Sequence, residues 1–72
     1  MARAKPRVEN RIRALRALHR EMTQQQLADL IGVTRQTVNA IEGGKYSPSL
    51  EVAFRIARVF ETPLEDVFQY VT

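Results

Sequence analysis

The sequence contains no cysteine, no tryptophan and a single histidine, His19, among its 72 residues. Without cysteine there is no disulfide, no thiol nucleophile and no cysteine-ligated zinc or iron–sulfur site, and one histidine cannot supply an imidazole pair for a metal. No run of apolar residues exceeds three, so the sequence predicts neither a membrane span nor a secretory signal. We therefore expect no metal, no cofactor, no membrane association and a cytoplasmic location.

The length indicates one small domain. A chain of this size buries only about 60% of its unfolded surface and gains roughly 3–5 kcal/mol from its core. A catalytic cleft needs more walls than such a domain can build, and the sequence shows no acid–base pair or activated nucleophile. It therefore predicts a binding module rather than an enzyme, and no small-molecule site is evident.

Positive charge is concentrated at the N-terminal end. Residues 1–20 carry seven arginines and lysines against one glutamate, whereas residues 21–50 and 51–72 have net charges of −1 and −2. A basic segment of this kind is typical of a protein that binds a polyanion, although a solvated tail that aids solubility is an equally good interpretation. We predict a basic arm over residues 1–8 and a folded domain over residues 9–72.

The three glycines and the three prolines all fall between segments with helical periodicity. Within those segments apolar residues recur three and four positions apart, which indicates amphipathic helices. The fourth segment is apolar on nearly every side, so we expect it at the centre of the bundle. The sequence predicts a compact all-α domain of five helices, at about 9–20, 24–31, 35–42, 48–60 and 63–68.

Local motifs mark the ends of the second helix and the start of the third. Thr23 and Gln26 have the spacing of a capping box, in which each side chain bonds the other residue's backbone amide. Gly32 suits the left-handed position that follows a helix. Thr34 is the expected N-cap of the third helix.

Similar motifs bound the later helices. The glycines in residues 43–45 are expected to end the third helix; a phosphate-binding loop is disfavoured because no strand precedes them and no Ser or Thr follows the lysine in the required place. We expect Ser47 to cap the fourth helix, with Pro48 as its first residue. A second capping box is predicted at residues 62–65, at the start of the fifth helix.

The second and third helices have the pattern of a helix-turn-helix, in which two helices are joined by a short turn containing glycine. Ala28, four residues before Gly32, is small enough to let the third helix approach. Val38 and Ile41 are spaced to fill the wedge between the two helices. This combination is far more specific than the basic composition, and it predicts binding to DNA.

The outward side of the third helix carries hydrogen-bonding side chains. Arg35 and Gln36 lie at its N-terminal end, which enters the major groove in helix-turn-helix proteins, and Asn39 and Glu42 are also expected to point outward. Arginine reads guanine, and glutamine or asparagine reads adenine, through paired hydrogen bonds. We expect Arg35, Gln36 and Asn39 to read bases; the alternative is an ordinary solvated helix face.

Other polar residues near these are expected to contact the DNA backbone. Free amides at the start of the second helix suit a phosphate, and hydroxyl or cationic side chains beside the third helix can reach the adjoining backbone. The expected backbone contacts are Thr23, Gln24, Thr34, Thr37, Lys45 and Tyr46.

Four segments carry a resemblance to a known family: residues 23–28 (TQQQLA), 31–42 (IGVTRQTVNAIE), 44–50 (GKYSPSL) and 62–69 (TPLEDVFQ). Through them the chain resembles the Cro/C1-type (Xre) helix-turn-helix family over about residues 10–70, and especially its compact stand-alone members, which include the cytolysin repressor of Gram-positive bacteria. The resemblance implies a bacterial, lambda-repressor-like DNA-binding domain, usually homodimeric, that controls transcription at a palindromic double-stranded operator. It also implies a phosphate contact for Gln24, and it adds Ser47 to the residues near the DNA backbone.

The C-terminal end has more large apolar side chains than a small bundle is expected to enclose. Either the core absorbs them or they form a homodimer interface, in which the β-prone ending of the chain adds a short strand. We favour the interface, because a bundle this small cannot enclose so many large side chains near its end. A dimer also fits the DNA, since two half-sites one helical turn apart require two copies of the third helix about 34 Å apart. The expected interface residues are Leu64, Val67, Phe68, Tyr70 and Val71.

Together these features favour a homodimeric transcriptional repressor that reads its operator through the major groove. Two alternatives remain: an antitoxin or restriction-system controller of the same fold, and a protein-interaction adaptor that does not bind DNA. The polar set on the third helix argues against the adaptor.

Overall fold

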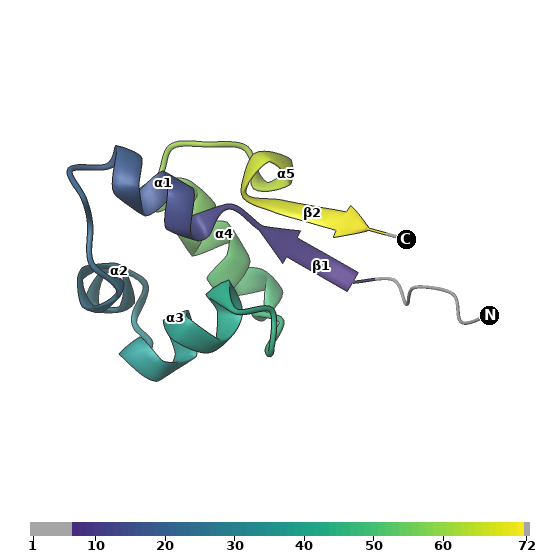
Figure 1. Cartoon of the computed structure of the whole chain (residues 1–72), viewed down its shortest axis with the longest axis horizontal. Helices are drawn as coiled ribbons and strands as arrows, with labels where there is room; N and C mark the ends of the chain where they lie inside the picture. The colour runs from purple at the N-terminus through teal and green to yellow at the C-terminus, as the bar shows by residue number, and fades with distance from the viewer. Residues whose placement is uncertain (1–6, 72) are drawn as a thin grey trace.

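The computed structural model describes residues 7–71 as five helices and one two-stranded sheet (Figure 1). Residues 1–6, which make up most of the predicted basic arm, lie outside the described residues. The elements in chain order are β1 (Arg7–Asn10), α1 (Ile12–Leu18), α2 (Gln24–Ile31), α3 (Arg35–Glu42), α4 (Leu50–Val59), α5 (Leu64–Val67) and β2 (Phe68–Val71). The predicted five-helix fold with a helix-turn-helix and a C-terminal strand is confirmed.

One apolar core holds the five helices together. Burying a Leu, Ile, Val or Phe side chain stabilises the fold by roughly 1.5–3 kcal/mol, and every helix contributes at least one such residue. The buried cluster consists of Ile12, Leu27, Ala28, Ile31, Val38, Ile41, Ile56, Ala57, Phe60 and Val67.

The caps around α2 and α3 are formed as the sequence predicts. The backbone amide of Gln26 donates to Thr23 Oγ1 over 3.0 Å, and the Gln26 side chain accepts from the Thr23 amide over 2.8 Å. Gly32 adopts the left-handed conformation after α2, with φ of 77°. Thr34 Oγ1 accepts from the amide of Thr37 over 3.2 Å at the start of α3.

We expect Gly32→Ala to lower the free energy of unfolding by about 1 kcal/mol, because an L-residue is disfavoured at positive φ. Its added Cβ would lie 3.4 Å from an Arg55 side-chain nitrogen, which is ordinary contact. Urea unfolding of both forms measures the difference. Gly43→Ala is the matched control, since Gly43 has an αR backbone and tolerates a Cβ. Equal losses in the two variants would contradict this assignment.

The predicted starts of α4 and α5 are wrong. Ser49, not Ser47, caps α4: its Oγ accepts from the amide of Val52 over 3.2 Å, and Pro48 lies before the cap. Thr62 forms no capping box: within residues 7–71 its hydroxyl makes one hydrogen bond, which it donates to the Phe60 carbonyl over 2.8 Å, and no side chain caps α5. The residue before α5 is Pro63, which has no side-chain group to cap the helix.

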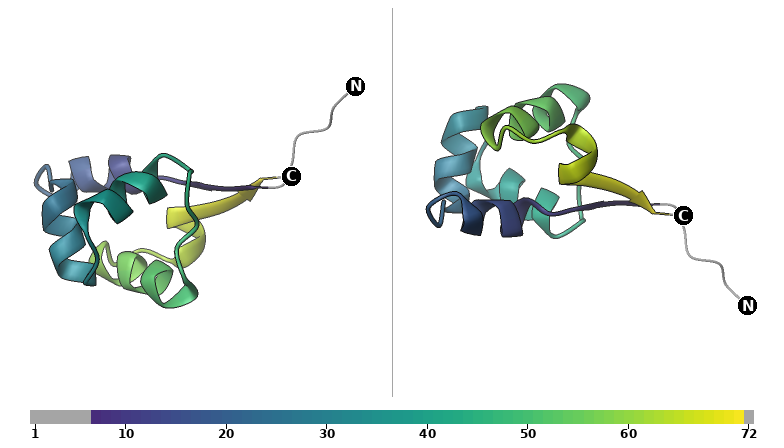
Figure 2. Two further views of the ribbon diagram at one scale, coloured as in Figure 1. Left: turned by 90° about the horizontal axis from the view of Figure 1, so that it is seen from below. Right: turned by 90° about the horizontal axis from the view of Figure 1, so that it is seen from above.

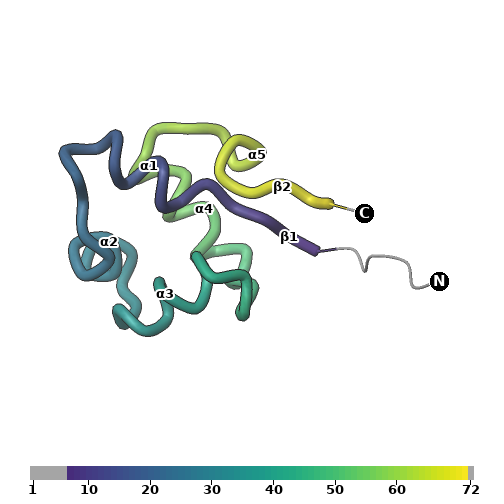
Figure 3. Tube along the Cα trace, in the orientation of Figure 1, coloured from purple at the N-terminus to yellow at the C-terminus, as the bar shows by residue number. Residues whose placement is uncertain are grey.

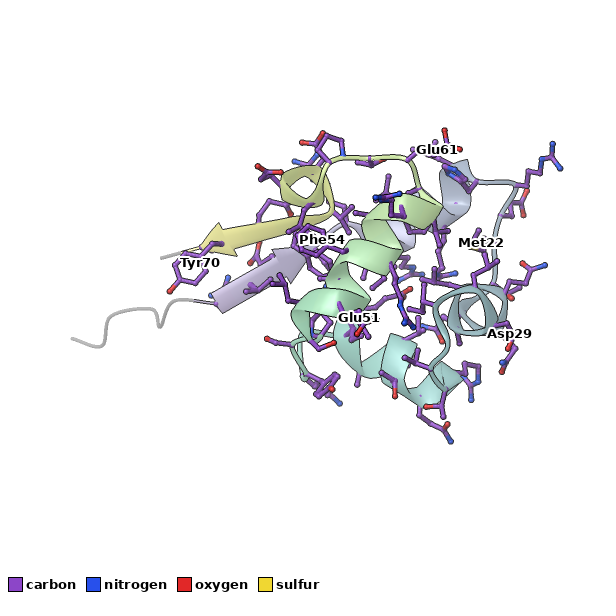
Figure 4. All side chains as sticks on the ribbon, turned by 180° about the vertical axis from the view of Figure 1, so that it is seen from behind. Met22, Asp29, Glu51, Phe54, Glu61 and Tyr70 are labelled. Carbon is purple, nitrogen blue, oxygen red and sulfur yellow. The ribbon has the colours of Figure 1, made fainter. Side chains whose placement is uncertain are left out.

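α4 is less enclosed than its composition predicts. Its inner side, formed by Ala53, Ile56 and Ala57, is buried, but Leu50 and Phe54 are 68% and 50% exposed. Figure 4 shows Phe54 on the outer side of this helix. The expectation of a central helix is wrong because, within residues 7–71, no element covers that outer side.

The chain ends of the described structure pair as an antiparallel sheet. The register joins Arg7 to Val71, Val8 to Tyr70, Glu9 to Gln69 and Asn10 to Phe68. Residues 9 and 10, predicted to begin the first helix, therefore lie in β1, and α1 begins only at Ile12. Residues 7 and 8, predicted to belong to the arm, also lie in β1.

The sheet projects from the helices. Figures 1 and 3 show β1 and β2 running side by side away from the bundle, and the two turned views of Figure 2 agree. No helix formed by residues 7–71 has the length and apolar character needed to cross a membrane.

Candidate nucleic-acid interface

α2 and α3 pack through their small and branched side chains. Leu27, Ala28 and Ile31 of α2 and Val38 and Ile41 of α3 are at most 2% exposed. The predicted wedge of Val38 and Ile41 is therefore buried as expected. This packing leaves the opposite side of α3 facing outward.

The first turn of α3 presents two free polar side chains. Arg35 and Gln36 are exposed, and among the described residues neither side chain forms a hydrogen bond or an ion pair. Asn39, one turn further on, is exposed too. The three residues predicted to read bases therefore share one accessible surface on α3.

Asn39 is held from the neighbouring helix. The Nε2 of Gln24, the first residue of α2, donates to Asn39 Oδ1 over 3.2 Å and to Glu42 Oε1 over 3.1 Å. A carboxamide oxygen has two lone pairs, so Asn39 keeps acceptor capacity as well as its NH2 group. Gln24, for which the sequence predicts a phosphate contact, thus also orients Asn39 of α3.

Glu42 does not point outward as predicted. Its carboxylate forms a two-point ion pair with Arg16 of α1, with distances of 2.6 and 3.0 Å. The side chains of Arg16 and Glu42 are only 15% and 8% exposed. Arg16 also donates to the Met22 carbonyl over 2.8 Å. The pair joins α1 to α3, and paired hydrogen bonds between charged groups are strong and geometrically specific.

This network borders a polar cleft of about 540 Å³. Its lining includes the cationic side chains of Arg13 and Lys45 and the polar side chains of Gln24 and Asn39. Lys45 and Arg13 are exposed. No sequence pattern singles out Arg13, because its place in this cleft depends on how α1 packs against α3.

The threonine hydroxyls have structural partners. Those of Thr23 and Thr34 cap helices, and Thr37 Oγ1 lies 3.0 Å from Thr34 Oγ1. Tyr46 and Ser47, in the loop after α3, are both exposed. Loop and cap residues thus flank the outward surface of α3.

The comparisons with known proteins agree with this geometry. The model of a family described as helix-turn-helix matches residues 12–67. The chain belongs to the Cro/C1-type helix-turn-helix family. Members of this family are DNA-binding transcriptional regulators, which are not enzymes.

Relatives within the Cro/C1-type family cover most of this chain. It is 51% identical over 63 residues to the uncharacterised HTH-type transcriptional regulator MJ0272 of Methanocaldococcus jannaschii, an alignment that covers 88% of this chain and 94% of that one. It is 46% identical over 61 residues to the regulator YgzD of Bacillus subtilis, covering 85% and 91%. It is 34% identical over 58 residues to the cryptic phage CTXphi transcriptional repressor RstR of Vibrio cholerae, covering 81% of this chain and 51% of RstR.

Solved structures show the same Cro/C1-type fold. A crystal structure of a protein from Bacteroides fragilis superposes with a TM-score of 0.73 at 21% identity, covering 86% of this chain and 98% of that one. The transcriptional regulator VanUg superposes with a TM-score of 0.71, also at 21% identity, covering 99% and 93%. At this identity the likeness concerns the fold alone.

The residues predicted to form a dimer interface differ in exposure. Tyr70 is 70% exposed, and Leu64, Phe68 and Val71 are half-buried. Val67 is 0% exposed, because it packs into the core of its own chain. Val67 therefore offers no surface to a second copy, and it belongs to the core.

Proposed function

We propose that this chain is a homodimeric repressor that recognises a palindromic operator by inserting α3 into the major groove. The observation that carries the proposal is the first turn of α3, where Arg35 and Gln36 are exposed beside Asn39 and have no side-chain partner within residues 7–71. Arginine, glutamine and asparagine at this end of a recognition helix match the donor and acceptor pattern of guanine and adenine. The kinship with RstR, which is named a repressor, favours repression over activation.

The polar cleft beside α3 suits the sugar–phosphate backbone. Gln24 stands at the start of α2, where free amides and the helix dipole favour an anion. Arg13 and Lys45 both line this cleft and supply positive charge to it. We assign the flanking Thr23, Thr34, Thr37, Tyr46 and Ser47 to the same backbone contacts, through hydroxyls and main-chain amides.

The proposed dimer brings the sheet ends of two copies together. Tyr70 and Val8 lie opposite each other in the register, so their side chains share one face of the sheet. Phe68, two residues before Tyr70 in β2, points to the same face, whereas Val71 points to the opposite one. We call the surface of Val8, Phe68 and Tyr70, together with Leu64 of α5, the dimer face, and we assign Val71 to its edge at the end of β2. Two copies joined in this way would present two α3 helices to successive half-sites, in the cytoplasm where the operator lies.

Selection of bound duplexes from a random library tests DNA recognition directly. It is expected to enrich a palindrome, and the enriched sequence supplies the half-site and its spacing. Enrichment of a single asymmetric site would contradict the dimeric arrangement. Absence of any sequence preference would contradict base reading by α3.

We expect Arg35→Ala to weaken binding to the selected operator by about 1–3 kcal/mol and to relax the preference at one base pair. Titration of operator and random duplexes with both forms measures the two effects. Arg58→Ala is the matched control, because it removes the same charge from an exposed position on α4. Equal losses on operator and random DNA would reduce Arg35 to a phosphate contact.

A further inference from the structure

The side chain of Asn10 joins three elements of the fold. Asn10 is the last residue of β1 and pairs with Phe68 of β2. Its Oδ1 accepts from the amide of Ile12, the first residue of α1, over 3.1 Å. Its Nδ2 donates to the carbonyl of Ile41 in the last turn of α3 over 2.9 Å. One half-buried amide thus contacts the sheet, α1 and the recognition helix.

Little else ties β1 to the end of α3. A cleft of about 370 Å³ opens between them, lined by residues 7–10 on one side and 42–44 on the other. Within residues 7–71, the bond from Asn10 is the only side-chain hydrogen bond between β1 and α3. The Ile41 carbonyl also accepts from the amide of Gly44 over 3.1 Å, so both of its lone pairs are engaged. The side-chain carboxamide of Asn10 is therefore a specific connection across an open cleft.

We propose that Asn10 is a positioning residue that fixes the angle between α3 and the sheet, and thereby the half-site spacing that the dimer prefers. The inference rests on the proposed dimer, in which the sheet ends of two copies meet. The orientation of each α3 relative to its sheet then sets the separation of the two recognition helices. Each added base pair moves a half-site by about 3.4 Å along the DNA and turns it by about 34°. A small change in the angle between α3 and the sheet therefore alters the half-site spacing that fits the dimer.

The test uses Asn10→Asp in the full chain. Aspartate keeps an acceptor for the Ile12 amide, at a helix start where a negative charge is favourable. It loses the donor to the Ile41 carbonyl and places a second oxygen opposite it. Asn10→Ser is the second variant, because its hydroxyl can still accept from the Ile12 amide but is too short to reach the Ile41 carbonyl. Glu9→Gln, an exposed change on the same strand, is the control.

The measurement compares affinities for duplexes that carry two fixed half-sites at separations varied in single base-pair steps. Wild type and Glu9→Gln are expected to show one sharp optimum. Both Asn10 variants are expected to reduce the preference for that optimum over its neighbours by about fivefold, the factor that corresponds to a hydrogen bond worth about 1 kcal/mol. The base preference within each half-site should stay unchanged, which a merely destabilised fold would not explain.

The outcomes separate this inference from the proposed function. If folded, dimeric Asn10 variants keep the wild-type optimum with the same sharpness, the inference is overturned while the dimeric repressor stands. If the wild type itself shows no spacing preference, the proposed dimer fails and the inference fails with it. If both variants are unfolded, as judged by circular dichroism, Asn10 serves fold stability and the positioning role is overturned.

Discussion

Glu42→Ala is expected to lower the free energy of unfolding by about 3 kcal/mol, because it leaves the Arg16 guanidinium unpaired in a largely buried place. This value is at the lower end for a broken buried ion pair, since Arg16 keeps some contact with water. The variant also removes one of the two partners that hold Gln24. Thermal and urea unfolding followed by circular dichroism measure the loss.

The chain supplies a matched control in Glu51→Ala. Glu51 and Arg55 form an ion pair of the same length, 2.6 Å, but their side chains are 73% and 51% exposed. An exposed pair one helical turn apart contributes about 0.3–0.5 kcal/mol, so the two variants should differ clearly. Replacing Arg16 and Glu42 together with methionine and leucine should recover much of the loss, because no unpaired charge remains. Equal effects of Glu42→Ala and Glu51→Ala would contradict the importance of burial.

The features that could be predicted from the sequence depend on short spans of chain. The capping box of Thr23 and Gln26, the left-handed Gly32 and the N-cap Thr34 each involve residues no more than three positions apart. The helix-turn-helix is also local, since the apolar wedge and the turn follow one another within about fifteen residues. Rules based on helix period and cap chemistry therefore apply directly to α2 and α3.

The features that could not be predicted depend on distant parts of the chain. β1 exists because it pairs with β2, some sixty positions later, and its own residues continue a helical pattern. Arg16 and Glu42 are 26 positions apart, and each taken alone resembles a solvated charge. Ser47 and Ser49 flank Pro48 and both satisfy the local rule for an N-cap, so only the observed hydrogen bond to Val52 decides between them.

The same division applies to the candidate site. Arg35, Gln36 and Asn39 could be chosen from α3 alone, because helical spacing separates them from the buried Val38 and Ile41. Their support could not, because Gln24, Arg16 and Asn10 come from three other elements. The free side chains of the first turn are thus predictable from local pattern, whereas the contacts that orient α3 follow from tertiary packing.

Tyr70→Asp is expected to convert the proposed dimer into monomers and to weaken operator binding by at least about a hundredfold, because the second half-site is then no longer bound at high effective concentration. The charge enters the centre of the dimer face, where a second copy would bury it without a partner. Tyr70 is 70% exposed and lies near the tip of β2, away from the helices (Figure 4), so each chain should keep its fold. Removal of residues 67–72 is a poorer test, since it deletes the core residue Val67. Sedimentation velocity and operator titration measure the two effects.

The control for this prediction is Leu18→Asp. Leu18 is 81% exposed and is the last residue of α1, which ends far from the sheet (Figure 1). It introduces the same charge at an equally accessible apolar position, so it should leave the sedimentation coefficient and operator affinity close to those of the wild type. Val8→Asp, across the sheet from Tyr70, should reproduce the monomer. An intact dimer in both Tyr70→Asp and Val8→Asp would move the interface away from the sheet, and spacing control by Asn10 would then lose its geometric basis.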